Sequence, residues 1–300
     1  MAQRTRKATA RVVLDFSFAE RAERLLGLAS ELLGRPRRPV LEGTAPRSLP
    51  EAALASIPRP RDDAFWCPVC ESFVPEFRPF GVAKRPNAQC PSCGALERHR
   101  SAWLFLKHAT DLCDGRDKLL LHPSPERHLG RLLPSLPGVR YLSSDIAPPA
   151  VSLALDLTRI PFPDRTFDSV YCSHVLEHIE NDHQAMAELL RILKPSGWAL
   201  VMTPIQGDTT NEDPSLRTKE ERLAHFGQVD HVRIYGRDIR GRLAEAGFEV
   251  AKHSGELGLA EPYRRFMGLK GTFIYLCTRP SVPRAASGGP PTVTDPGRMC

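Results

Sequence analysis

Short apolar runs alternate with stretches of helical spacing along the central part of the chain. The runs predict strands at 118–122, 139–144, 152–156, 167–173, 198–203, 248–252 and 271–278. Helical spacing between the runs is typical of a parallel sheet with crossover helices. The pattern therefore predicts an α/β fold built on a seven-stranded sheet.

The clearest helix lies between the fourth and fifth expected strands. Asp182 is the expected N-cap, and Pro195 with Gly197 is expected to stop the helix. Its apolar face consists of Ala185, Met186, Leu189, Leu190 and Leu193.

Both ends of the chain have different patterns. Apolar residues recur at helical spacing within 18–34, and charged residues of both signs lie on the other face. This pattern predicts an amphipathic helix that packs on the protein or on a second copy. Residues 35–62 are rich in proline and predict a linker, and residues 280–300 have the composition of a disordered tail.

Composition narrows the class of protein. With 300 residues, 41% hydrophobic and 25% charged, the chain can build one large domain and a smaller one. No apolar run is long enough to span a bilayer, and residues 1–11 are not followed by a secretion signal, so we expect a cytoplasmic protein that does not contact membranes. The formal charge of +6 is compatible with nucleic acid, but the charge is not concentrated in one block and nucleic acid is not the favoured partner.

Four of the eight cysteines form two CxxC pairs, Cys67/Cys70 and Cys90/Cys93, separated by nineteen residues. Two such turns complete the tetrahedral sulfur shell that zinc favours, and a filled shell makes the metal structural. A pair of redox dithiols is the alternative, but redox CxxC motifs come singly. This pattern predicts a zinc ribbon. Basic residues surround it, and they either suit an anionic substrate or form a solvated face: Lys84, Arg85, Arg98, His99 and Arg100.

The run 155–178 and the segment 193–197 resemble the type-11 domain family of class I S-adenosylmethionine-dependent methyltransferases. The likeness covers about 117–278. The CxxC pairs, residues 94–100 and residues 226–233 also resemble a bacterial subgroup with a zinc ribbon before this domain. The resemblance implies a Rossmann-like sheet, methyl-transfer activity and S-adenosylmethionine as cofactor. The chain then divides into 1–34, 35–62, a zinc ribbon at 63–95, a connecting helix at 96–116, a methyltransferase domain at 117–279, and 280–300.

Ligands of open parallel sheets bind beyond the carboxyl ends of the strands. By the resemblance, Asp145 accepts hydrogen bonds from the ribose hydroxyls with Ile146 beside the adenine, and Asp156 with the Leu157 amide contacts the adenine edge. The alternative for each aspartate is a turn or capping residue. Ser173 and His174 are expected under the methionine part of the cofactor.

The turn after the first strand departs from the family, because it lacks the glycine-rich pattern. It reads His122-Pro123-Ser124-Pro125-Glu126. We expect this turn to pass under the methionine part, with Glu126 replacing a backbone contact. The alternative is a degenerate domain that binds no cofactor.

Residues 174–178 also match the H-x-x-E-H motif of inverted zinc peptidases. That motif requires both histidines on one helix, whereas His174 here directly follows a predicted strand. We therefore expect His174 in a strand-to-helix turn, which argues against a peptidase.

The connection 206–235 is too long for an ordinary loop and predicts a lid or substrate loop that contains His225, Asp230 and His231. His231 is the expected catalytic base, with Asp230 or His178 behind it; each is also explained as a structural polar contact.

The sequence thus predicts methyl transfer to an oxygen or nitrogen of a small molecule or biosynthetic intermediate. The alternatives are methylation of RNA or another macromolecule gripped by the ribbon, and a non-catalytic adaptor. The acceptor and the oligomeric state are not predicted.

Overall fold

A computed structural model describes residues 49–81, 83–146 and 151–280 of the chain. The helix expected within 18–34, most of the proline-rich linker and nearly all of the expected tail lie outside the described residues. In the part of the chain that is described, no helix is long and apolar enough to cross a membrane.

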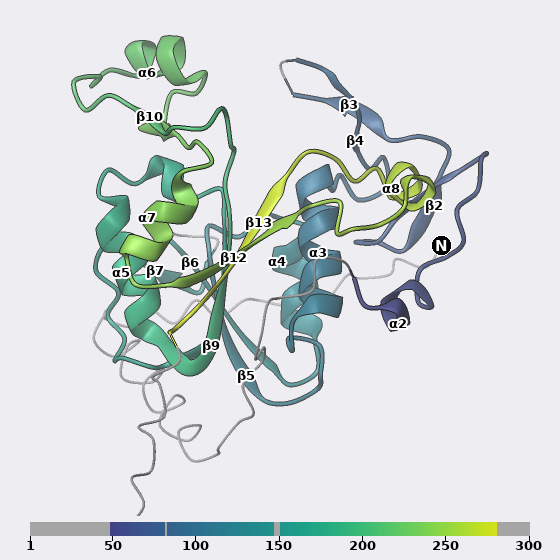
Figure 1. Cartoon of the computed structure of the whole chain (residues 1–300), viewed down its shortest axis with the longest axis horizontal. Helices are drawn as coiled ribbons and strands as arrows, with labels where there is room; N and C mark the ends of the chain where they lie inside the picture. Colours follow the sequence, from purple (N-terminus) through teal and green to yellow (C-terminus); the bar gives the residue numbers. More distant parts are fainter. Residues whose placement is uncertain (1–48, 82, 147–150, 281–300) are drawn as a thin grey trace, which may run out of the picture.

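A seven-stranded sheet forms the centre of the molecule (Figure 1). All seven expected strands are present, in the spatial order β12-β13-β9-β8-β5-β6-β7. Their bounds are β5 (Lys118–Pro123), β6 (Val139–Asp145), β7 (Leu153–Ala154), β8 (Phe167–Ser173), β9 (Leu193–Met202), β12 (Glu249–Ser254) and β13 (Phe273–Thr278).

The predicted Rossmann-like seven-stranded sheet is confirmed, and its strands are parallel except at β13. This strand pairs antiparallel with both β12 and β9, whereas β5, β6, β7, β8 and β9 pair in parallel. A parallel strand would require the chain to cross back to the opposite end of the sheet after β12. The chain makes no such crossover, so β13 runs antiparallel to β12 and inserts between β12 and β9.

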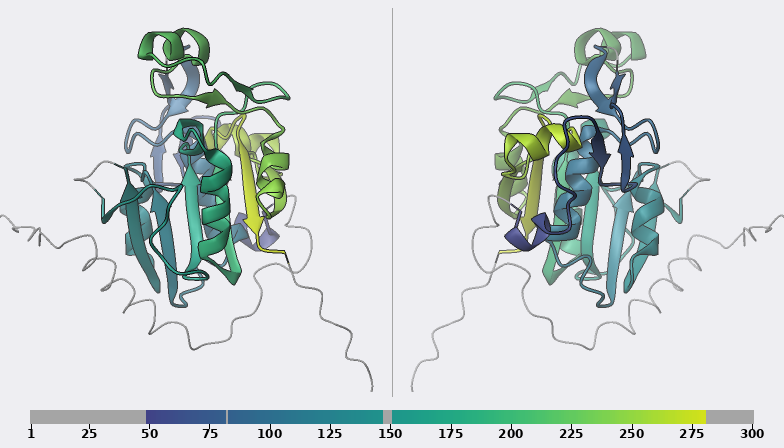
Figure 2. Two further views of the ribbon diagram at one scale, coloured as in Figure 1. Left: turned by 90° about the vertical axis from the view of Figure 1, so that its left-hand side faces the viewer. Right: turned by 90° about the vertical axis from the view of Figure 1, so that its right-hand side faces the viewer.

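Helices cover both faces of the sheet (Figure 2). The two faces have separate cores, because successive residues of a strand point to opposite sides: Tyr171 of β8 belongs to one core, and Val170 and Cys172 belong to the other. One layer contains α3 (Glu97–Ala109), α4 (Leu129–Leu132) and the 3-10 turn η1 (Leu133–Ser135), and the other contains α5 (Asp182–Ile192) and α7 (Ile239–Glu245).

Helix α5 is confirmed, but its ends differ from the prediction. Asn181 is the N-cap, since its side chain accepts a hydrogen bond from the Gln184 amide at 3.1 Å. Asp182 is instead buried and accepts hydrogen bonds from other elements. The helix ends at Ile192, and β9 begins at Leu193, ahead of Pro195 and Gly197.

The four-cysteine segment forms two small hairpins beside α3. These are β1 (Phe65–Cys67) with β2 (Ser72–Val74) and β3 (Arg78–Phe80) with β4 (Arg85–Gln89); the short helix α2 (Glu51–Leu54) precedes them and α8 (Glu261–Met267) packs on β1. Their own core is small, as the sequence predicts. We call these hairpins the ribbon.

Two residues of the expected basic face are not at the surface. His99 is 3% exposed, and its Nδ1 accepts a hydrogen bond from the Leu96 amide at the start of α3. Arg100 is fully buried between the ribbon and the residue after α8. Both lie on the side of α3 that faces the protein interior, and hydrogen bonds to the backbone compensate for their burial.

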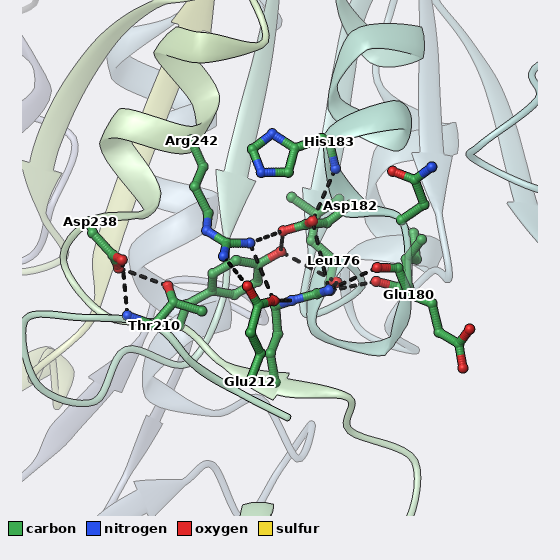
Figure 3. A network of polar contacts seen from close by, with 12 residues as sticks. Leu176, Glu180, Asp182, His183, Thr210, Glu212, Asp238 and Arg242 are labelled. Carbon is green, nitrogen blue, oxygen red and sulfur yellow. Dashed lines mark hydrogen bonds and ion pairs between the residues drawn. The ribbon is translucent and has the colours of Figure 1, made fainter. Parts of the chain in front are cut away.

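The expected loop 206–235 is largely structured. It contains β10 (Asn211–Glu212), α6 (Lys219–Phe226) and β11 (Arg233–Ile234), and we call it the substrate segment. A polar network holds its end against η2 (Leu176–His178) and α5 (Figure 3). Arg233 donates to the carbonyls of Leu176 and Glu180 at 3.2 and 2.9 Å, and Tyr235 donates to Asp182 at 2.6 Å.

Candidate active site

The carboxyl ends of β5, β6, β7 and β8 surround a cavity of about 370 Å³, which we call the inner cavity. The predicted cofactor residues Pro123, Ser124, Asp145, Ile146, Asp156, Leu157 and His174 all line it. Sequence reasoning missed Ser144, Leu155, Val175 and Ile179, which also line it and directly neighbour the predicted residues. The predicted residues therefore come together from four separate strand ends.

Strand pairing brings the two aspartates together. Asp145 pairs with Ala154 in the β6–β7 ladder, and its carbonyl accepts a hydrogen bond from the Leu155 amide at 2.8 Å. Asp156 then follows in the same cavity wall. Its Oδ1 accepts hydrogen bonds from the amide and the hydroxyl of Thr158, both at 2.8 Å. Asp156 thus serves a turn, as the alternative interpretation holds, while it also faces the cavity.

In the turn after β5, a serine occupies the backbone conformation that glycine usually adopts. Ser124 has φ of +44°, the left-handed region that glycine usually occupies, and its amide donates to the Ser144 carbonyl at 2.6 Å. The backbone therefore makes a tight turn beside the cavity without a glycine.

We expect Ser124→Gly to keep or slightly raise stability, and Ser124→Val to lower the free energy of unfolding by about 1–2 kcal/mol, because a left-handed backbone costs a β-branched residue that much. Urea unfolding of the three proteins measures both changes. Equal stability of the valine variant and the wild type would contradict the turn geometry.

His122 and Glu126 do not line the inner cavity, although a cofactor contact was predicted for both. His122 is fully buried, with Nδ1 at 3.0 Å from the Tyr141 hydroxyl and Nε2 at 3.0 Å from Glu126. Burial alone would raise the pKa of Glu126, but the hydrogen bond with His122 and the nearby His99 lower it to about 2. His122 and Glu126 therefore stabilise the turn after β5 from the protein interior. Ser173, at the end of β8, is buried, and its side chain also helps to lower the pKa of Glu126.

A second, larger cavity of about 1010 Å³ adjoins the first, and we call it the outer cavity. The ribbon contributes Phe80, Gly81 and Arg85 to its wall, and the substrate segment contributes residues 226–228 and His231. In Figure 1, hairpin β3–β4 and helix α6 project beyond the same edge of the sheet. The outer cavity therefore lies between the ribbon and the substrate segment.

His174 and His178 line both cavities and mark their junction. His174 has φ of +56° and follows β8 directly, so it lies in a strand-to-helix turn as predicted. Glu177 and His178 lie in the three-residue turn η2, and His174 lies outside it. The helix that an H-x-x-E-H peptidase site requires is therefore absent at residues 174–178.

The predicted proton-transfer residues come together at this junction. The rings of His178 and His231 pack edge to face with centroids 4.7 Å apart, and His178 Nδ1 lies 3.1 Å from the Asp230 carbonyl and 3.4 Å from its carboxylate. Burial lowers the pKa of His231, and the charge of His178 acts in the same direction. His225 is exposed outside both cavities, 3.1 Å from Asn211 Oδ1.

The four cysteines form one cluster in the ribbon. Sγ of Cys67 lies 3.8 Å from that of Cys93, and Sγ of Cys70 lies 3.9 Å from that of Cys90. In a tetrahedral site with Zn–S bonds of about 2.3 Å, sulfur atoms lie about 3.8 Å apart. The donor set and its spacing therefore fit zinc, and the cluster is compatible with a zinc ribbon.

A family model and several known proteins are similar to parts of this chain. Residues 132–201 match the family model described as "Methyltransferase domain". An "Uncharacterized 37.1 kDa protein in transposon TN4556" of Streptomyces fradiae is 29% identical over 104 residues, which is 34% of this chain and 30% of that protein. A "Ubiquinone/menaquinone biosynthesis C-methyltransferase UbiE" of Geobacter sulfurreducens is 44% identical over 43 residues, 14% of this chain and 17% of that protein.

The matches thus span less than a third of the length of these two relatives. Among solved structures, the YcgJ protein of Bacillus subtilis shares 17% identity, covers 61% of this chain and 100% of its own, and has a TM-score of 0.42. Residues 132–201 thus resemble a methyltransferase domain, and the observed strand order is that of a Rossmann-like sheet; together they support a class I methyltransferase domain.

Proposed function

We propose that the protein transfers the methyl group of S-adenosylmethionine to an oxygen or nitrogen atom of a small molecule. One observation carries the proposal: seven of the ten predicted cofactor residues line the inner cavity, which shares His174 and His178 with a larger cavity beside it. A donor in the first cavity and an acceptor in the second would meet at this junction.

The residues of the inner cavity suit a nucleoside. Asp145 would accept hydrogen bonds from both ribose hydroxyls, and Ile146, which is 77% exposed, would cover one face of the adenine. Asp156 Oδ1 is occupied by Thr158, so Oδ2 would accept from the adenine amino group. The methionine part would lie along the Ser124 turn toward the junction.

Methyl transfer is an in-line displacement in which the donor supplies an activated methyl group on a sulfonium. The chain's main tasks are to align the acceptor and to exclude water. His174 and His178 border the path between the cavities. The acceptor's proton would leave toward His231, with Asp230 and His178 behind it.

The outer cavity favours a small acceptor over a macromolecule. Its volume of about 1010 Å³ is at the upper end of small-molecule sites, and the ribbon and the substrate segment bound it on two sides. Arg85, Arg98 and Lys270 line it, so an acceptor with an anionic group fits. The Geobacter relative is named a C-methyltransferase, and a carbon acceptor would be a distinct outcome of the test below.

Asp145→Ala tests the cofactor site. Two hydrogen bonds to a carboxylate at about 1.5 kcal/mol each predict a loss of about 3 kcal/mol, or about 100-fold in affinity. Titration calorimetry with S-adenosylhomocysteine, the demethylated product, measures this change. Asp164→Ala is the matched control, because Asp164 is exposed, pairs with Arg191 and lies outside both cavities.

Wild-type affinity in Asp145→Ala, or no binding to the unaltered protein, would overturn the cofactor assignment. The acceptor is then found by incubating the protein with methyl-labelled cofactor and a fractionated cell extract. Label in the small-molecule fraction supports the proposal, whereas label in RNA or protein fractions contradicts a small acceptor.

A further inference from the structure

We propose that Glu177, His178 and His231 bind a divalent transition-metal ion at the wall of the outer cavity, and that this ion holds a hydroxyl acceptor. The second part rests on the proposed methyl transfer, while the first part does not. The site is separate from the four cysteines of the ribbon.

Three different donors meet at one point. One ligand atom of each residue lies within 4.8 Å of the others; Glu177 and His178 are adjacent in η2, and His231 comes from the substrate segment. The amide of Val232 donates to the Glu177 carbonyl at 3.0 Å, which fixes the two segments side by side. Ligands about 2.1 Å from one ion lie about 3–4 Å apart, so small side-chain rotations complete the shell.

One of the donor atoms is buried without a partner. His231 is 7% exposed, and its Nδ1 has no hydrogen-bond partner among the described residues. An unpartnered buried atom costs about 1–3 kcal/mol in a folded protein. Glu177 is 1% exposed, and its Oε1 lies 3.4 Å from His174 Nδ1. A bound cation would satisfy His231 Nδ1 and would compete with His174 for Glu177 Oε1.

The remaining contacts resemble the outer shell of a metal site. Thr203 donates to Glu177 Oε2 at 2.9 Å, which leaves Oε1 as the outward donor. His178 Nδ1 lies beside the Asp230 carbonyl and carboxylate, so Nε2 remains for an ion. Metal-binding histidines usually make such a second hydrogen bond, because it fixes the tautomer and the ring.

The donor set indicates the class of ion. Two imidazoles and one carboxylate suit divalent ions such as Mn, Fe, Co and Zn, whereas Mg and Ca prefer oxygen donors. All three residues line the outer cavity. Coordination positions would therefore remain open toward an acceptor.

An ion in this position selects oxygen over nitrogen. A hydroxyl bound to a divalent ion loses its proton more readily and keeps lone pairs for attack, whereas an amine would spend its lone pair on the ion. The oxygen–carbon bond forms as the sulfur–carbon bond breaks, and the proton passes to solvent in the cavity. With the ion bound, His231 and His178 act as ligands, and coordination replaces them in removing the proton.

Titration with Co²⁺ tests binding without any activity. Protein with the ribbon zinc in place should take up one further Co²⁺, with a visible spectrum free of the thiolate bands of a cysteine site. Glu177→Gln and His231→Asn should each weaken binding by more than about tenfold, since even outer-shell changes cost 10–100-fold. His225→Asn is the matched control, because His225 is exposed and outside both cavities.

Folding is checked by S-adenosylhomocysteine binding, since Glu177 and His231 do not line the inner cavity. A wild type that binds this nucleoside but no Co²⁺, or variants that bind Co²⁺ as tightly as the wild type, would overturn the metal site and leave the proposed function standing. His174→Gln should retain Co²⁺; loss there would contradict the named ligand set. If Co²⁺ binds but methyl transfer proceeds equally without it, the hydroxyl-acceptor part is wrong.

Discussion

Cys90→Ser is expected to unfold the ribbon and abolish methyl transfer while the sheet keeps its fold and its affinity for the cofactor. Structural zinc contributes about 10–16 kcal/mol of apparent binding free energy in small domains, far more than the ribbon's few buried side chains provide. Phe80, Gly81 and Arg85 then leave the outer cavity, but no ribbon residue lines the inner one.

Three measurements check this result: zinc content, protease cleavage within 63–95, and calorimetry with S-adenosylhomocysteine. Cys113→Ser is the matched control, since Cys113 is an exposed cysteine outside the cluster. A ribbon that stays resistant to protease after loss of zinc would contradict a metal-dependent fold. Loss of nucleoside binding together with zinc would show that the two parts of the molecule fold as one unit.

The strands were predictable because their signal is local. Most strands of the sheet contain a short apolar stretch, and β8, in which every residue is buried, was predicted to the residue although Asp168, Ser169 and Ser173 are polar. Strand direction has no such signal. The reversal of β13 follows from its pairing with β12, which the runs themselves do not encode.

The burial of Arg100 also has no local signal in the sequence. Arg100 looked like part of a basic surface because its neighbours Arg98 and His99 are also basic. The structure places Arg100 inside, where carbonyls of the ribbon and of Gly268 converge. Those carbonyls come from segments distant in sequence, so no local pattern predicts that they meet.

The candidate site divides in the same way. Asp145 and Asp156 were predictable because acids at consecutive strand ends must meet at one edge of a parallel sheet. The clustering of Glu177 with His231 has no local signal in the sequence. His231 lies more than fifty residues from Glu177, and Arg233 and Val232 hold its segment against η2.

Arg100→Ala is expected to lower the free energy of unfolding by about 3–5 kcal/mol, the cost of breaking a buried charged network. The guanidinium is fully buried and donates to the carbonyls of Ala88, Ala95 and Gly268 at 2.8–2.9 Å, and it lies 4.0 Å from the centre of the Phe77 ring. Alanine leaves those carbonyls unpaired and opens a cavity. Urea unfolding measures the loss.

Arg100→Lys separates charge from shape. A lysine keeps the charge but has a point-like ammonium in place of the planar fork that reaches the ribbon and Gly268 together, so most of the loss should remain. Arg116→Ala is the control, because that arginine is 53% exposed, pairs with Asp114 and should contribute less than about 1 kcal/mol. Wild-type stability in the lysine variant would mean that charge alone holds the ribbon on the sheet. Since the ribbon forms one wall of the outer cavity, the same variant should bind S-adenosylhomocysteine normally but methylate more slowly.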